Sequence, residues 1–264
     1  MIKVARRIGM LLVIIYVLGC IILYVKQDDI IFRPTPLDEG TSYRWGKEVY
    51  IDVAQDVQLH GLYHQTANAD GAILYLHGNR GNTRWCQRQA QSFDGFGKDV
   101  LLIDYRGYGK SDGEIESLKQ LESDMDRVYE WLQSQHPNLP VWVAGYSLGS
   151  GLASYLASKH DAESLILIAP YESLEAMKDG ILPIIPDFLL KYPLDNKKHL
   201  DDYNGRVAIF HGTEDEVIPY AHSERLYAEY TDKIKFITLE NVGHRRAIFH
   251  PSISNYLEQL TTSL

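Results

Sequence analysis

The sequence has little cysteine, since only Cys20 and Cys86 occur among its 264 residues. Two cysteines cannot form the disulfide framework of a small secreted protein, so disulfides do not define this fold. The body of the chain also lacks a block rich in lysine and arginine, and the formal net charge is -9. A nucleic acid is therefore a poor candidate for a partner, because binding to phosphates requires a basic surface.

Internal repeats and low-complexity segments are missing as well. Hydrophobic residues, in contrast, make up 45% of the sequence, which is enough for one core. We therefore predict a single α/β domain over residues 48–264. An N-terminal tip with a membrane anchor (residues 1–28) and a connector (residues 29–47) precede it.

The anchor is predicted from residues 8–25, which contain no charged side chain. At 1.5 Å per residue, such a helix nearly spans a hydrocarbon core of about 30 Å. One alternative is a cleaved signal peptide, and another is lipoprotein processing, since Val17-Leu-Gly-Cys20 is similar to the box before a lipidated cysteine. The apolar run continues past Cys20, where a lipoprotein would have a polar tether, so we favour an uncleaved anchor.

Basic residues flank this segment unequally. Lys3, Arg6 and Arg7 precede it, whereas only Lys26 and Arg33 follow soon after it. Because basic flanks stay in the cytoplasm, we predict a cytoplasmic N-terminus. The α/β domain would then lie on the periplasmic or outer side of a cell membrane, or in a lumen in a eukaryote.

The body of the chain has the pattern of a hairpin followed by a parallel sheet. Residues 48–54 and 58–64 alternate apolar and polar side chains, as an antiparallel hairpin at a sheet edge does. Short, continuously apolar runs then predict buried strands at residues 72–76, 100–103, 141–144, 165–168, 207–210 and 234–239. Helices are predicted at residues 118–132, 147–158, 223–231 and 253–264. This alternation is typical of an α/β fold with helices on both faces of the sheet.

Nearly forty residues separate the fourth and fifth of these apolar runs. We predict that residues 171–203 form a small lid-like insert over the carboxyl end of the sheet, where open α/β proteins bind ligands. The alternative is a helix that packs on the sheet as part of the core.

A candidate nucleophile lies in the segment Gly145-Tyr-Ser147-Leu-Gly149, between a strand and a helix of small residues. A serine at the apex of such a turn has a strained backbone, and side chains at the flanking positions would crowd it. Its hydroxyl is then exposed at the carboxyl end of the sheet. An ordinary strand-to-helix loop is the alternative, because the pattern is short.

A nucleophilic serine needs a base and a carboxylate that orients the base. Asp215 follows one predicted strand and His244 follows the next, so both can meet Ser147 at the carboxyl edge of the sheet. Glu214 and Glu216 flank Asp215, and periodicity does not choose among the three acids. A solvated acidic turn and an exposed histidine are the alternatives.

Acyl transfer also needs N–H donors for the developing oxyanion, each worth about 2.7–4 kcal/mol. Leu148, directly after the serine, supplies one through its backbone. We expect the second from Asn79 in the loop His77-Gly-Asn-Arg-Gly-Asn82, because glycines let its N–H turn into the site. A nucleotide-binding loop would have a lysine directly after its last glycine, and this loop has none.

Five motifs in this order resemble the α/β-hydrolase superfamily, and within it the membrane-anchored serine hydrolases related to acyl-protein thioesterases, lysophospholipases and esterases. The resemblance runs from about residue 50 to the C-terminus. The motifs are Leu76–Asn82, Asp104–Gly113, Gly145–Gly149, His211–Pro219 and Gly243-His244.

The resemblance implies that Ser147 is the nucleophile, His244 the base and Asp215 the orienting acid, with Asn79 and Leu148 as backbone oxyanion donors. It implies two-step hydrolysis of a carboxylic ester or thioester through an acyl-enzyme, with a lipid, an acylated protein or a small molecule as the acyl substrate. It implies neither a metal nor an organic cofactor.

The resemblance also gives residues 104–112 a structural role beside the pocket. The family often has a small residue where Arg80 stands, so we expect a cation at the pocket mouth.

Two other functions remain open at this point. A serine peptidase that cuts near an amino terminus would need an acid in the insert to bind the amine, and the apolar segment 181–192 has only Asp187. A membrane-tethered binding protein with a degenerate site is the other, and the complete set of serine, histidine and aspartate argues against it.

Overall fold

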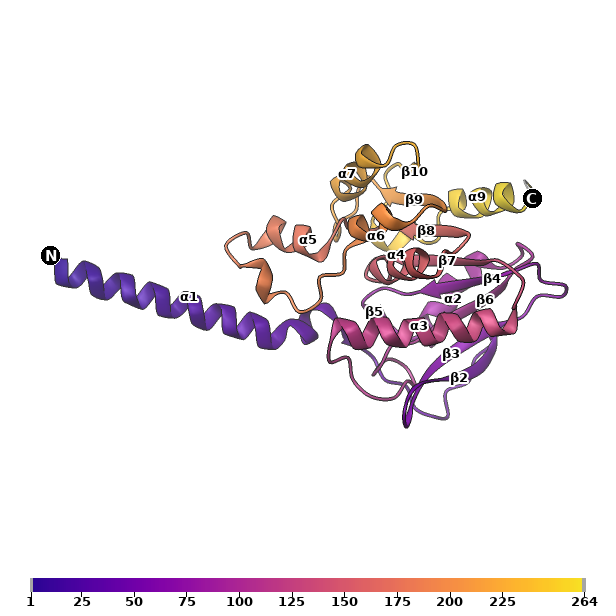
Figure 1. Ribbon diagram of the computed structural model, residues 1–264, viewed down its shortest axis with the longest axis horizontal. Coiled ribbons are helices and arrows are strands. Elements are labelled where there is room, and N and C mark those ends of the chain that lie inside the picture. Colours follow the sequence, from indigo (N-terminus) through magenta and orange to yellow (C-terminus); the bar gives the residue numbers. More distant parts are fainter. Residues whose placement is uncertain (1, 263–264) are drawn as a thin grey trace.

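The computed structural model describes residues 2–262 and shows a long N-terminal helix that leads into a layered α/β domain (Figure 1). Eight strands form one sheet in the order β10-β9-β8-β7-β4-β6-β3-β2. The hairpin of β2 (Lys47–Ala54) and β3 (Val57–His64) is antiparallel and lies at one edge, and β3 is also antiparallel to β6 (Asp99–Ile103). The other strands are parallel: β4 (Ala72–Leu76), β7 (Val141–Tyr146), β8 (Ser164–Ile168), β9 (Arg206–Gly212) and β10 (Ile234–Leu239). The predicted α/β fold with a mostly parallel sheet is confirmed.

The central strands are buried along their whole length because helices cover both faces of the sheet. Successive side chains of β4 face opposite sides, so that Ile73 and Tyr75 belong to one core cluster and Leu74 and Leu76 to the other. Helices α3 (Leu118–Gln135) and α4 (Gly149–His160) contribute to the second cluster. Helices α2 (Thr83–Ala90) and α9 (Pro251–Thr262) contribute to the first.

The predicted helices lie close to their expected positions, as α3, α4, α7 (Ala221–Glu229) and α9. Helix α2 was not predicted. The 3-10 turn η1 (Gln91–Phe93) and the short helix α8 (His244–Ala247) were not predicted either.

The insert between β8 and β9 has two different parts. Its second part, α6 (Asn196–Asp202), buries Asn196 and Leu200 and packs on α4. Its first part contains α5 (Leu174–Ile181) and the 3-10 turn η2 (Asp187–Leu189), and neither of them buries a residue. The insert therefore contributes a helix to the core and also projects a second, outward part that lies beside the N-terminal helix (Figure 1).

Helix α1 (Ile2–Ile31) extends three residues beyond the predicted end of the anchor, and among its residues only Cys20 is buried. It is long and apolar enough to cross a membrane, a property that it shares with signal sequences. The connector then runs extended. Its residues Arg33–Pro34 form a short strand, β1, that pairs in parallel with β5 (Arg80–Gly81) in the glycine-rich loop after β4.

Candidate active site

Ser147 lies in the turn between β7 and α4, at the carboxyl end of the sheet. Its φ angle is +54°, in the left-handed region that residues with a Cβ seldom adopt. Its N–H donates to the carbonyl oxygen of Ile168 at the end of the neighbouring strand, at 3.0 Å. The turn thus has the strained geometry that we expected of a nucleophilic serine.

The glycines beside Ser147 are required by close packing. A Cβ at Gly145 would lie 2.5 Å from the carbonyl oxygen of Gly149, and a Cβ at Gly149 would overlap the carbonyl oxygen of Leu76. These contacts involve backbone atoms, which cannot rotate away. A side chain at either position would therefore force the backbone of the turn to shift.

We expect Gly149→Ala to lower the melting temperature of the protein by about 5–10 °C, because backbone overlap strains the turn. Gly180→Ala is the matched control, since no atom lies within 4 Å of a Cβ built there. Thermal unfolding followed by circular dichroism measures both. An unchanged melting temperature for Gly149→Ala would contradict the packing argument.

His244 follows β10 and begins α8, and its ring faces Ser147. The Nε2 atom lies 3.0 Å from the Ser147 hydroxyl oxygen. The backbone N–H of His244 donates to Glu216 Oε2 at 3.1 Å, and its carbonyl oxygen accepts from the Tyr146 hydroxyl at 3.2 Å. Both backbone polar groups of His244, the N–H and the carbonyl, are therefore held by hydrogen bonds, and these fix the position of its side chain.

Asp215 follows β9 and completes the row of side chains. Its Oδ2 atom lies 2.7 Å from His244 Nδ1. Its Oδ1 atom accepts from the N–H groups of Val217 at 2.9 Å and Ile218 at 2.8 Å. Because a carboxylate only accepts, Nδ1 of His244 carries the proton and Nε2 is left to accept from Ser147.

The structure separates the three neighbouring acids that periodicity left open. The carboxylate of Asp215 contacts the His244 ring, that of Glu216 binds the His244 backbone, and Glu214 is exposed. Burial raises the pKa of Asp215, but hydrogen bonds from His211 and His244 outweigh it and hold that pKa below its ordinary value.

His211 is a neighbour of this site to which the sequence assigned no role. Its Nε2 lies 2.9 Å from the Ile218 carbonyl oxygen and 3.3 Å from Asp215 Oδ2. Its Nδ1 lies 2.6 Å from the Ser223 hydroxyl, which can donate to it. The proton therefore lies on Nε2, and His211 contacts the same carboxylate oxygen, Asp215 Oδ2, that faces His244.

Both expected oxyanion donors lie in segments that adjoin Ser147. Leu148 is the N-cap of α4, where helix N–H groups point outward and favour negative charge. The loop with Asn79 passes close by, since a Cβ at Gly78 would lie 3.3 Å from the Ser147 Cβ. The two segments therefore border the space in front of the serine hydroxyl.

The Asn79 carbonyl group, which belongs to the peptide after the expected N–H donor, is held by contacts that sequence reasoning missed. Its carbonyl oxygen accepts from the Tyr108 hydroxyl at 2.9 Å and from the Arg33 N–H at 3.1 Å. The Arg33 N–H also lies 2.9 Å from the Tyr108 hydroxyl oxygen, so the three groups form a closed set. Tyr108 lies within the predicted structural loop 104–112. Through this contact, that loop supports the loop that contains Asn79.

We expect Tyr108→Phe to lower kcat about fivefold and to leave KM unchanged, because one of the two hydrogen bonds that hold Asn79 through its carbonyl group is lost. Tyr203→Phe is the matched control. Its buried hydroxyl donates to the Ala162 carbonyl oxygen at 2.8 Å, at the amino end of β8. Steady-state kinetics on a soluble ester compares them, and an equal loss in both variants would contradict a positioning role for Tyr108.

A buried polar network lies beneath the same loop. His77 Nδ1 is 2.7 Å from the Gly78 carbonyl oxygen, and His77 Nε2 is 3.4 Å from Asp104 Oδ1. The N–H of Thr83 donates to Asp104 Oδ2 at 3.0 Å. Burial raises the pKa of Asp104, but contacts with His60 and His77 hold it below its ordinary value. Asp104 therefore links the loop after β6 to the loop that holds Asn79.

Arg80 is exposed, and its backbone pairs with Arg33 in the β1–β5 ladder. The structure therefore gives Arg80 a main-chain role in holding the connector. A cation at the pocket mouth stays a prediction.

Comparison with known proteins is consistent with this geometry. Residues 67–192 match the family described as serine aminopeptidase, S33. An uncharacterized protein of Mycobacterium tuberculosis (Rv2307c) is 28% identical over an alignment that covers 92% of this chain and 89% of that protein. Lysophosphatidylserine lipase ABHD12 of Macaca fascicularis is 27% identical over an alignment that covers 70% of this chain and 54% of that protein.

Solved structures with a similar fold include the following two. Est1E of Butyrivibrio proteoclasticus with bound ferulic acid has a TM-score of 0.67 and 19% identity, over 81% of this chain and 98% of that chain. Esterase Pf2001 of Pyrococcus furiosus has a TM-score of 0.68 and 17% identity, over 88% of this chain and 96% of that chain. Together with the sheet order, these similarities show that the chain has the α/β-hydrolase fold.

Proposed function

We propose that this protein is a serine hydrolase that cleaves carboxylic esters or thioesters of acyl chains. The observation that carries the proposal is the row Ser147, His244 and Asp215, with distances of 3.0 and 2.7 Å between successive side chains. This arrangement has the nucleophile, base and orienting acid that acyl transfer needs.

In the proposed reaction, Ser147 Oγ attacks the carbonyl carbon while His244 Nε2 takes its proton. The N–H groups of Asn79 and Leu148 stabilise the oxyanion of the tetrahedral intermediate. When the intermediate collapses, His244 gives the proton to the leaving alcohol or thiol, and an acyl-enzyme remains. Water, deprotonated by His244, then attacks the acyl-enzyme, and the acid is released.

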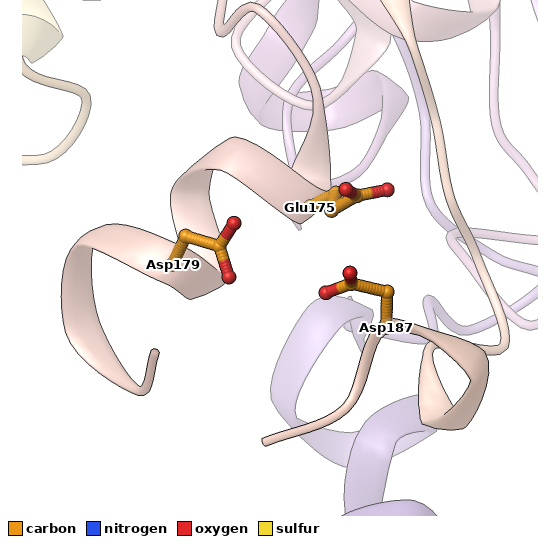
Figure 2. Close-up of side chains that lie close together, drawn as sticks. All are labelled: Glu175, Asp179 and Asp187. Carbon is orange, nitrogen blue, oxygen red and sulfur yellow. The ribbon is translucent and has the colours of Figure 1, made fainter. Parts of the chain in front are cut away.

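An aminopeptidase is the second candidate, and the description of the matched family favours it. Such an enzyme needs a free acid to bind the substrate amine. Figure 2 shows Glu175, Asp179 and Asp187 pointing toward one another on the insert, and one oxygen of each lies within 4.8 Å of the others. Of these three acids, only Asp187 lies in the apolar segment 181–192.

This acidic cluster is a poor amine site for two reasons. All three residues are exposed. Lys178 already lies 2.5 Å from both Asp179 and Asp187 and so supplies the cation that an amine would replace. Apolar residues dominate the rest of the insert's outward part, and they favour an acyl chain as the substrate group.

The proposal is tested by a substrate panel on the full-length protein. We expect acyl esters and thioesters to be hydrolysed faster than aminoacyl amides at equal concentration. A fluorophosphonate probe should label the protein, because it reacts with activated serines. Faster cleavage of aminoacyl amides would favour the peptidase, and a lack of labelling would favour a binding protein with a degenerate site.

We further propose that α1 is an uncleaved membrane anchor with its N-terminus in the cytoplasm. A contact of the apolar part of α1 with the insert supports retention of the helix: the Tyr16 hydroxyl donates to the Ile184 carbonyl oxygen at 2.7 Å. Cleavage of a signal peptide after the apolar run would remove Tyr16 and this contact with it. The basic residues before the apolar run support the orientation.

A further inference from the structure

The most exposed apolar side chains of the insert lie at one end of it. Ile181, Ile184 and Phe188 are 72%, 69% and 83% exposed, and Leu182 is also exposed. We call residues 181–189 the insert tip. Large apolar residues this exposed and this close in sequence indicate a surface that another apolar phase covers.

The insert tip is attached to α1 by polar contacts. The Tyr16 hydroxyl donates to the Ile184 carbonyl oxygen at 2.7 Å. Further along, Gln27 Nε2 donates to the Leu189 carbonyl oxygen at 2.6 Å. Its Oε1 accepts from the Lys191 N–H at 2.8 Å. These contacts fix the tip alongside the helix over more than three turns.

Apolar contacts lie between these polar ones. Phe188 and Leu189 border a groove against α1 that is also lined by Tyr16, Val17, Cys20, Ile21 and Tyr24. Cys20, at 8% exposure, is the one buried residue in the described part of α1. The tip therefore packs on the half of the helix that belongs to the apolar run.

Along both α1 and the insert, apolar residues are followed by charged ones in the same direction. Tyr16 and Cys20 lie within the charge-free run that ends at Val25, about 14 and 8 Å before its end at 1.5 Å per residue. Beyond that end, Asp28 pairs with Lys191 of the insert at 2.8 Å. The apolar part of the insert thus faces the apolar part of α1, and its charged end faces the charged end.

An apolar cavity of about 290 Å³ separates the two elements closer to the domain. Its wall includes Leu23 and Ile31 from α1 and Met177, Leu182 and Leu190 from the insert. A cavity with such a wall does not hold water well, because water would lack polar partners. Hydrocarbon is the phase that suits this face of the protein.

We propose that the insert tip is a second membrane-binding element that enters the leaflet on the domain's side of α1. Its partner is the acyl-chain region of the lipid bilayer. The inference goes beyond the hydrolase activity and rests on α1 lying in the membrane. The contacts at Cys20 and Tyr16 lie about 8 and 14 Å from the end of the apolar run, so the tip reaches the 5–10 Å at which interfacial elements bury their apolar faces and extends a few ångströms beyond it.

The charged residues of the insert limit this depth. Lys178 pairs with Asp179 and Asp187, and Glu175 lies beside them, which leaves an excess of negative charge. Charged groups are costly in hydrocarbon but tolerated among headgroups. The acidic cluster of Figure 2 therefore belongs at the membrane surface, with the apolar side chains of the tip below it.

Depth-dependent fluorescence quenching on the full-length protein in phosphatidylcholine vesicles tests the proposal. In a Cys20→Ala, Cys86→Ala background, single cysteines from Phe188→Cys, Ile22→Cys and Trp85→Cys carry an environment-sensitive label. Ile22 lies in the apolar run of α1 and Trp85 on α2, and they are 61% and 64% exposed. The label at position 22 is the control for a lipid environment, and the label at position 85 is the control for exposure to water.

We expect the label at position 188 to be quenched by lipids spin-labelled near the headgroup and to be shielded from aqueous acrylamide. Quenching of that label by acrylamide as strong as at position 85, with position 22 lipid-quenched, would overturn the proposal. If position 22 is not lipid-quenched either, α1 is not in the membrane and the inference fails with it. None of these outcomes depends on catalysis, so they are separate from the proposed function.

A pair of variants gives a second readout. Ile184→Asp with Phe188→Asp should lower hydrolysis of a long-chain ester held in vesicles on the order of tenfold, because two large apolar side chains lose their burial. Hydrolysis of a soluble short ester should not change, and Trp85→Asp should affect neither. Equal rates of the double variant and the wild type on the vesicle substrate would count against the proposal.

Discussion

Replacing Ser147 by alanine is expected to lower kcat for a short p-nitrophenyl ester by about a millionfold, to the level that binding and the oxyanion donors supply alone. The reason is that the acyl-enzyme can form only on the Ser147 oxygen, which lies 3.0 Å from its base. Initial rates measured at saturating substrate give the change in kcat, and labelling by a fluorophosphonate should be lost in parallel.

The fold should not change with this variant. Alanine has a Cβ as serine does, so the left-handed φ of +54° costs about the same in both proteins. Ser154→Ala is the control, because this buried serine on α4 donates only to the Gly151 carbonyl oxygen of its own helix, at 3.0 Å. Full activity in Ser147→Ala, or an equal loss in Ser154→Ala, would disprove the assignment of the nucleophile.

Replacing Asp215 by asparagine is expected to lower kcat about ten-thousandfold with little change in packing. The Oδ1 position accepts from two N–H groups, those of Val217 and Ile218, so the amide oxygen of asparagine must stand there. Its NH2 group then faces His244 Nδ1 and makes that atom an acceptor. The imidazole proton moves to Nε2, which can no longer take the proton of Ser147.

Glu214→Gln is the control for this variant, because Glu214 is a neighbouring acid whose side chain is exposed. It should keep wild-type kcat, and a comparable loss there would show that the acidic turn acts through its total charge.

The pH dependence of stability provides a second measurement of the role of Asp215. Since the pKa of Asp215 is depressed in the fold, its stabilising effect is complete above the ordinary value near 3.9 and is lost as the pH falls below it. Melting temperature should therefore fall less steeply below pH 4 in Asp215→Asn than in the wild type.

The sheet was predictable because its signal is local. Strands buried on both faces are apolar throughout, and one of them, β4, begins and ends at the residues that the apolar run indicates. Helix α3 was equally clear, because its buried residues recur on one face. These elements can be predicted without knowing which segments pack against them.

Helix α2 could not be predicted in the same way. It has eight residues, of which Thr83, Cys86 and Ala90 are buried, and its remaining residues are mainly polar. The helix depends on its N-cap, where the Asn82 side chain accepts from the Trp85 N–H at 3.2 Å. That asparagine had been interpreted only as part of the glycine-rich loop.

Contacts between distant segments were also beyond the sequence. Spacing placed Asp215 and His244 at neighbouring strand ends, but the choice of Asp215 over its two neighbours depends on how the backbone turns at Val217 and Ile218. The contact between Gln27 and Leu189 joins residues 162 positions apart. No periodicity in either segment indicates the other.

The pairing of β1 with β5 has a consequence for how this protein can be handled. The first residues after α1 are hydrogen-bonded to the loop that contains Asn79, through the Arg33 N–H and through Asn82 Nδ2, which donates to the Thr35 carbonyl oxygen at 3.0 Å. A shortened protein that begins at the α/β domain would therefore lack the segment that holds the loop with Asn79, besides lacking its hydrophobic helix. Solubilising this enzyme by truncation and preserving its turnover are compatible only if the cut falls before Phe32.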